Sequence, residues 1–71
     1  MTVYCIVVYN HKEETATVSQ EAYRRYEQAE MFVKSRSDNP IEKKLYSSGC
    51  GRTGVFIGRD NKYVIKEIRV V

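Results

Sequence analysis

The sequence predicts a two-layer α+β domain, in which one amphipathic helix packs on a mostly antiparallel sheet of four or five strands. Three observations support this fold class. The chain opens with the apolar run Val3–Tyr9, continues with a helical apolar repeat, and ends with further runs rich in β-branched and aromatic residues after Pro40. Its 71 residues predict a single domain, residues 1–71, with a small core.

The first element is a strand over Val3–Tyr9. Both alternating faces of this run are apolar, which is typical of a central strand that is covered on both sides. Residues 10–14 are polar and predict a turn. Thr15–Val18 is β-branched in character and predicts the second arm of a hairpin.

The helix is predicted from an apolar stripe at 100° per residue. Met31 lies on the opposite side of the helix. The pairs Glu21–Arg25 and Glu30–Lys34 have the favourable order for residues four apart. The stripe consists of Ala22, Tyr26, Ala29 and Val33, flanked by Tyr23 and Phe32.

The two ends of the helix are not equally well defined. Pro40 disfavours helical geometry at Asn39, so the helix ends before this point. Its start has two alternatives: Ser19 caps the helix, or the second strand extends to Tyr23 and the helix begins at Arg24.

After Pro40, strands are predicted at Ile41–Tyr46, Val55–Ile57 and Tyr63–Val71, with a tight turn at 59–62. The alternation of the last strand slips around Lys66 and Glu67. This slip predicts a bulge or a charged edge strand.

The helix segment Glu27–Val33 contains the pattern E-x-A-E-x-F, and the ending Tyr63–Ile68 contains Y-x-I-x-E. With the leading strand, these features resemble small orphan proteins of bacteria and their phages. The resemblance implies an α+β fold and a bacterial or phage origin, and it implies no particular function.

A second resemblance covers Ser47–Ile57, which is similar to the second half of the phosphate-binding loop of protein tyrosine phosphatases. That family has a nucleophilic cysteine six residues before an arginine, but the residue six positions before Arg52 is Tyr46. Cys50 is only two residues before Arg52, too close to occupy the same position. The sequence therefore predicts no enzyme, no catalytic residue and no cofactor. A metal site is not expected either, because His11 is the only histidine.

The charge is unevenly distributed. Residues 1–40 have a formal charge of −1 and residues 41–71 have +4. The second half is thus the candidate for contacts with an anion or a nucleic acid, although the same charges also suit an ordinary solvated surface. The candidate residues are Lys43, Lys44, Arg52, Arg59 and Lys62.

Two segments have both a functional and a structural interpretation. The glycines of Gly49–Gly54 allow either an anion-binding nest of backbone amides or a simple hairpin connection, and the connection is the more common case. Tyr23–Tyr26 alternates aromatic and basic residues as nucleic-acid surfaces do, but a solvated helix face is the simpler interpretation.

One helix can cover only one face of the sheet, whereas the first strand is apolar on both. We therefore predict a protein-interaction module that self-associates, as a homodimer, through the uncovered face, with its specific protein partner unknown. The alternative is a nucleic-acid-binding domain. Low cysteine usage, the lack of a secretory signal and the lack of a membrane-spanning segment predict a cytoplasmic location.

Overall fold

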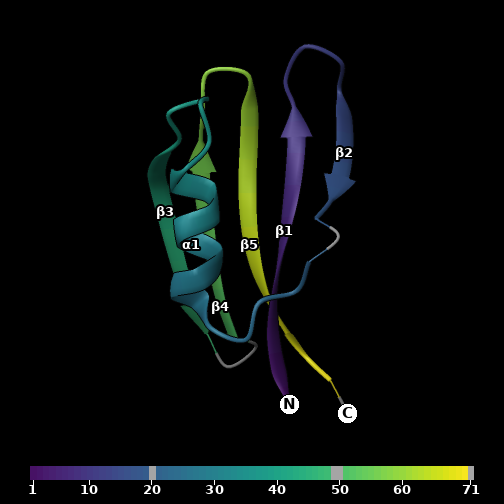
Figure 1. Cartoon of the computed structure of the whole chain (residues 1–71), viewed down its shortest axis with the longest axis vertical. Coiled ribbons are helices and arrows are strands. Elements are labelled where there is room, and N and C mark those ends of the chain that lie inside the picture. The colour runs from purple at the N-terminus through teal and green to yellow at the C-terminus, as the bar shows by residue number, and fades with distance from the viewer. Residues whose placement is uncertain (20, 49–50, 71) are drawn as a thin grey trace.

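The computed structural model describes residues 1–19, 21–48 and 51–70, with the backbone alone at residues 46–48. Within these residues one antiparallel five-stranded sheet and one helix confirm the predicted α+β class (Figure 1). No helix in this part of the chain is long and apolar enough to cross a membrane. The elements are β1 Thr2–Asn10, β2 Thr15–Val18, α1 Tyr26–Lys34, β3 Ile41–Ser48, β4 Gly51–Ile57 and β5 Asn61–Arg69.

The strand order is β2-β1-β5-β4-β3, so the last strand in the sequence lies at the centre of the sheet. β5 pairs with β1 without interruption, from Arg69 opposite Thr2 to Asn61 opposite Asn10. The prediction of a bulge or an edge strand around residues 66–67 is therefore wrong. The register shift occurs instead in the edge strand β3, between Glu42 and Lys44.

The charged residues of β5 have a different explanation. Tyr63 and Ile65 are buried on the side of the sheet that faces α1, and Glu67 follows on that same side. Lys66 points to the other side. The alternation is thus intact, and the α1 side changes from apolar to polar at Glu67, beyond the buried residues of the core.

β2 ends early, and the chain after it continues along the edge of β1. The backbones of Tyr23 and Tyr4 exchange two hydrogen bonds of 2.7 and 2.9 Å, as an isolated bridge outside the named strands. The second strand therefore does not extend to Tyr23 as a continuous element. This bridge holds the segment that leads into the helix against the sheet.

The helix begins at Tyr26, later than both sequence alternatives, and Arg25 is its N-cap residue. Gln28 closes the first turn, because its Oε1 atom accepts a hydrogen bond of 3.3 Å from the Arg25 amide. Ala22 lies outside the helix and is exposed, so its assignment to the buried stripe is wrong. The pair Glu21–Arg25 is likewise not a helical pair.

The rest of the predicted stripe is confirmed. Tyr26, Ala29 and Val33 are buried, whereas Met31 on the opposite side is 71% exposed. Glu30 and Lys34 form the expected ion pair at 3.6 Å. The helix lies on one face of the sheet (Figure 1). Its backbone comes closest to β5 and β1, and it completes a core with four strand residues. These are Ile6, Phe56, Tyr63 and Ile65.

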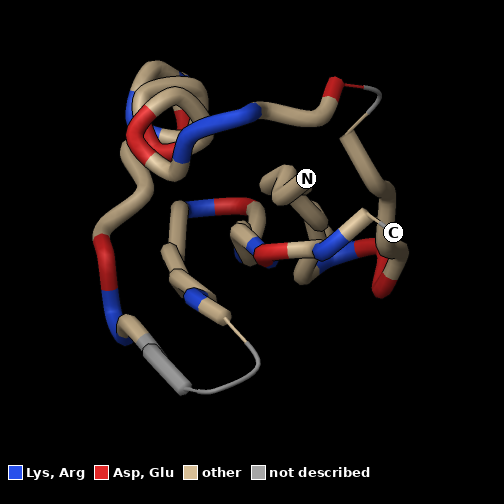
Figure 2. Tube along the Cα trace, turned by 90° about the horizontal axis from the view of Figure 1, so that it is seen from below, with Lys and Arg blue, Asp and Glu red and all other residues tan. Residues whose placement is uncertain are grey.

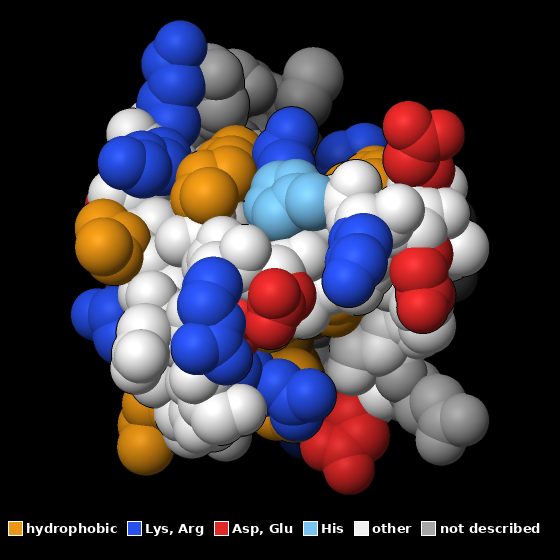
Figure 3. Space-filling view, turned by 90° about the horizontal axis from the view of Figure 1, so that it is seen from above, with side chains coloured by type: hydrophobic (Ala, Val, Ile, Leu, Met, Phe, Trp, Pro, Cys, Tyr) orange, Lys and Arg blue, Asp and Glu red, His pale blue; other side chains and the backbone are white. Residues whose placement is uncertain are grey.

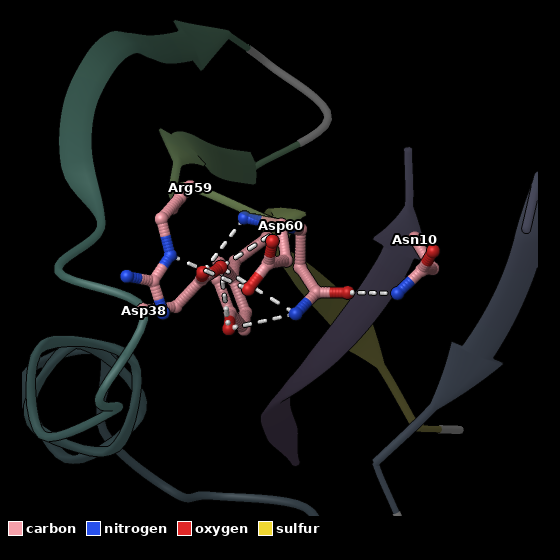
Figure 4. A network of polar contacts seen from close by, with 6 residues as sticks. Asn10, Asp38, Arg59 and Asp60 are labelled. Atoms are coloured by element: carbon pink, nitrogen blue, oxygen red, sulfur yellow. Dashed lines mark hydrogen bonds and ion pairs between the residues drawn. The ribbon is translucent and has the colours of Figure 1, made fainter. Parts of the chain in front are cut away.

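The loop between α1 and β3 contributes one buried charge, Asp38. Its carboxylate accepts hydrogen bonds from the backbone amides of Asp60 and Asn61, at 2.7 and 2.9 Å. It also accepts bonds from the Asn61 side-chain amide and the Tyr63 hydroxyl, at 3.4 and 3.2 Å (Figure 4). Asp38 thereby fixes the turn between β4 and β5 to the loop that follows the helix.

Candidate functional site

The face of the sheet opposite α1 has no layer over it within the described residues. Figure 2, which views the molecule from below, shows α1 and the segment that leads into it on one side of the strands. In the strand register Val7, Val64 and Val55 form a row across β1, β5 and β4. We call the following set the open face: Val3, Cys5, Val7, Tyr9, Ala16, Val18, Ile41, Lys44, Thr53, Val55, Ile57, Lys62, Val64, Lys66 and Ile68.

The open face is apolar at its centre and includes several large exposed side chains. Tyr9 is 42% exposed, Ile68 43%, Val18 60% and Ile41 64%. Its charged residues are all lysines, and none of the described strand residues on this face is acidic. The Lys62 ammonium lies 5.8 Å from the centre of the Tyr9 ring, a cation–π contact that partly covers the ring. The face is thus both apolar and basic.

The structure distributes the five predicted contact residues over several parts of the surface. Lys44 and Lys62 lie on the open face, and Lys43 lies at the register shift of the edge strand β3. Arg59 is in the β4–β5 turn, where its side chain is 3.6 Å from Asp60. Arg52 lies on the other side of the sheet, next to the helix. The five residues therefore do not form one surface.

Arg52 is part of a different arrangement that the sequence did not predict as a unit. A pocket of about 470 Å³ lies between the N-terminal end of α1 and the adjacent end of the sheet. Four arginines line it: Arg24 and Arg25 from the basic segment before α1 (Figure 2), Arg52 from β4 and Arg69 from β5. We call this site the arginine pocket.

The wall of the arginine pocket is built from two tyrosines in contact. The rings of Tyr4 and Tyr26 meet edge to face, with centroids 5.8 Å apart. The Arg52 guanidinium lies 5.0 Å from the centre of the Tyr26 ring. Since Tyr26 is buried and fixed by the core, this stacking holds the Arg52 side chain in place.

Two glutamates, Glu27 and Glu67, also line the arginine pocket. The Tyr4 hydroxyl donates a hydrogen bond of 2.9 Å to Glu67 Oε1, and this bond raises the pKa of Tyr4. Among the described residues, none of the four pocket arginines has a carboxylate within ion-pair distance. Four guanidinium groups and two carboxylates leave a formal charge of +2.

Two glycines shape this region. Gly51 has a φ of +117°, a conformation that side chains disfavour, and the Glu67 side chain occupies the space that a Cβ atom would need. Gly54 lies directly against the Tyr26 hydroxyl. These glycines thus have packing roles. The expectation of a backbone anion nest also involves Gly49 and Cys50, which lie outside the described residues.

The opposite end of the molecule has mixed charges. Figure 3, viewed from above, shows basic and acidic side chains interspersed around His11. Within the described part of the chain, no three His, Cys, Asp or Glu side chains are grouped so that they could hold a metal ion. The Cys5 thiol on the open face is free.

Sequence reasoning missed the arginine pocket because its residues come from distant parts of the chain. In the sequence, Arg24 and Arg25 belong to an aromatic and basic segment, and Arg69 lies far from them in the last predicted strand. One signal was present: a β4–β5 hairpin places Thr53 opposite Lys66, and so brings Arg52 towards Glu67. The approach of Arg24 and Arg25 depends on the Tyr4–Tyr23 bridge, which no local pattern indicates.

Comparisons with known proteins found no match to this chain among family models, curated proteins or solved structures.

Proposed function

We propose that the protein is an interaction module that self-associates through the open face, as a homodimer, and is not an enzyme. The observation that supports this is the row of Val7, Val64 and Val55 across the three central strands, with no covering layer in the described chain. Burial of a continuous apolar surface against another surface removes it from water and lowers the free energy of the protein.

The size of the open face suits a second copy of the chain. With strands about 4.8 Å apart and about 3.4 Å per residue, a five-stranded sheet of this length has a face of about 500 Å². Two copies would bury about 1,000 Å² in total, at the lower limit for specific interfaces. We therefore expect a weak dimer, with its monomer and dimer in measurable equilibrium at micromolar concentrations.

The lysines of the open face determine how salt affects this equilibrium. Lys62 and Lys66 flank Val64 on the same strand, so two facing copies bring like charges together. Added salt screens this repulsion. The affinity of the dimer at about 500 mM salt should therefore be equal to or higher than its affinity at about 50 mM. Binding of a nucleic acid to the same lysines would weaken steeply over this range, because counterions compete for the phosphates.

The experiment is sedimentation equilibrium of the wild type and two variants at both salt concentrations. Val64→Lys adds a charge between Lys62 and Lys66 at the centre of the face and should give a monomer. Met31→Lys adds the same charge to the exposed side of α1 and should behave as the wild type. A wild type that stays monomeric at millimolar concentration, or equal association of the two variants, would contradict the proposal.

The nucleic-acid alternative is tested in the same sedimentation experiment by adding a single-stranded oligonucleotide. A monomer that binds the oligonucleotide only at low salt would replace the proposal with this alternative. The bacterial or phage origin and the cytoplasmic location stay predictions.

A further inference from the structure

We infer that the arginine pocket is a binding site for a small phosphomonoester, such as a sugar phosphate. This site is on the α1 side of the sheet and is separate from the open face. The inference rests on five observations. They are the pocket's size, its charge, the lack of ion-pair partners for its arginines among the described residues, the fixed position of Arg52 and the acceptors beside the arginines.

The charge of the pocket matches this ligand class. A phosphomonoester has a charge of about −1.5 to −2 near neutral pH. The four arginines and two glutamates of the pocket leave +2, which would neutralise one such group. Arginine remains protonated at any physiological pH and donates two parallel hydrogen bonds to phosphate oxygens.

The arginines are also available. Among the described residues no carboxylate lies within ion-pair distance of Arg24, Arg25, Arg52 or Arg69. Glu67, the acid that β5 places beside them, accepts the Tyr4 hydroxyl instead. In the described part of the chain, the pocket thus contains cationic donors without a carboxylate partner. They lie next to the N-terminal end of α1, where the helix dipole adds further positive potential.

The position of Arg52 is fixed before a ligand arrives. Its guanidinium stacks on Tyr26, and Tyr26 is held by Tyr4 and by the core. A guanidinium that lies over an aromatic ring can still donate hydrogen bonds through its N–H groups. Binding therefore requires little ordering of this side chain, a cost that otherwise weakens affinity.

The remaining features indicate a small ligand with hydroxyl groups. A volume of about 470 Å³ exceeds that of a phosphate ion and is within the range of small-molecule sites. Glu27 and Glu67 line the same pocket and can accept hydrogen bonds from hydroxyls. The net charge of +2 is neutralised by one phosphomonoester, whereas a chain of phosphodiesters would bring further negative charges next to these carboxylates. We therefore favour a single terminal phosphate over a nucleic-acid backbone.

The test is a titration by NMR of the full chain with ribose 5-phosphate, inorganic phosphate and ribose. Both phosphates should bind, ribose 5-phosphate more tightly, and ribose should not. Arg52→Leu should weaken ribose 5-phosphate binding about tenfold or more, the equivalent of one charge-assisted hydrogen bond. Arg52→Lys retains the charge without the paired donors and should also weaken it.

The matched control is Arg59→Leu, because Arg59 is exposed in the β4–β5 turn and already near Asp60. It should leave binding unchanged. Equal losses in Arg59→Leu and Arg52→Leu would mean a general charge effect and would overturn the inference. So would failure of the wild type to bind either phosphate at tens of millimolar.

Three further measurements complete the test. Arg24→Leu changes an exposed side chain outside the helix and strands, and should weaken binding without affecting the fold.

An oligonucleotide without terminal phosphates supplies only phosphodiesters. If it binds more tightly than ribose 5-phosphate and loses binding in Arg52→Leu, the site is a nucleic-acid backbone site and the inference is wrong. Val64→Lys on the open face should not affect the titration, so the two proposals fail independently.

Discussion

The hydroxyl of Tyr63 in β5 donates a hydrogen bond of 3.2 Å to the carboxylate of Asp38, a residue 25 positions earlier in the chain. Among the described residues, Asp38 is the one charged residue that is buried. It also accepts hydrogen bonds from two backbone amides of the β4–β5 turn. This carboxylate joins the loop after the helix to the centre of the sheet (Figure 4).

Asp38 should make the stability of the fold depend on pH. Burial raises the pKa of its carboxyl, but the hydrogen bonds from Asp60, Asn61 and Tyr63 outweigh this and lower the pKa below its ordinary value of 3.8. A lowered pKa in the folded state means that the unfolded chain binds the proton more readily. The contribution of Asp38 is thus complete above pH 3.8 and is lost as the pH falls through the folded pKa.

We expect Asp38→Asn to lower the free energy of unfolding by about 1–3 kcal/mol at pH 7, because it removes the charge that the four donors share. The difference between variant and wild type should shrink at acidic pH. Urea unfolding at pH 7 and pH 3 measures this. Asp60→Asn is the control, since its exposed side chain contributes little. A constant difference at both pH values would contradict the expectation.

The orientation of α1 predicts opposite effects for two substitutions on the same helix. Ala29 is fully buried, so Ala29→Glu places a charge without a partner in the core and should prevent folding. Met31→Glu, at a position that is 71% exposed, should change the stability by no more than about 0.5 kcal/mol. Circular dichroism and thermal unfolding compare the two. Equal stability would mean that the helix is rotated.

The Tyr26 hydroxyl is buried and has no hydrogen-bond partner among the described residues. Such a group costs free energy in the folded state, and burial also raises the pKa of Tyr26. We therefore expect Tyr26→Phe to raise the free energy of unfolding by about 1 kcal/mol. The ring remains, so its contacts with Tyr4 and Arg52 are preserved. A loss of stability in denaturant unfolding would show that the hydroxyl has a partner.

Gly54 should be coupled to this hydroxyl. A Cβ atom at Gly54 would meet it directly, so Gly54→Ala should cost about 1–3 kcal/mol. In the Tyr26→Phe background the cost should be smaller, because the nearest remaining ring atom is 3.1 Å away. Gly58→Ala, which would meet Asp38 instead, provides the control. Its cost should be the same in both backgrounds, and an unchanged cost of Gly54→Ala would refute the coupling.

Cys50 provides a test of the proposal that the protein is not an enzyme. We expect its thiol to react with alkylating agents at the rate of an unactivated cysteine, whereas an activated nucleophile would react rapidly even at mildly acidic pH. We also expect no hydrolysis of an aryl phosphate. Turnover that is abolished by Cys50→Ser would refute both expectations.

The sequence by itself determined the fold class and the orientation of α1. A repeat of 3.6 residues identifies the buried side of a helix, and Tyr26, Ala29 and Val33 lie there as predicted. Alternation likewise indicated that β1 is apolar on both faces. These properties could be predicted because they depend on residues a few positions apart in one element.

Only the tertiary structure decided which elements lie side by side. It placed β5 at the centre of the sheet, although its charges suggested an edge, and it started the helix at Tyr26, so that Ala22 is outside the helical stripe. It also brought Arg24, Arg52 and Arg69 to one pocket. The physical reason is that strand order is set by the burial and backbone pairing of the whole chain, to which each segment contributes only its own apolar face.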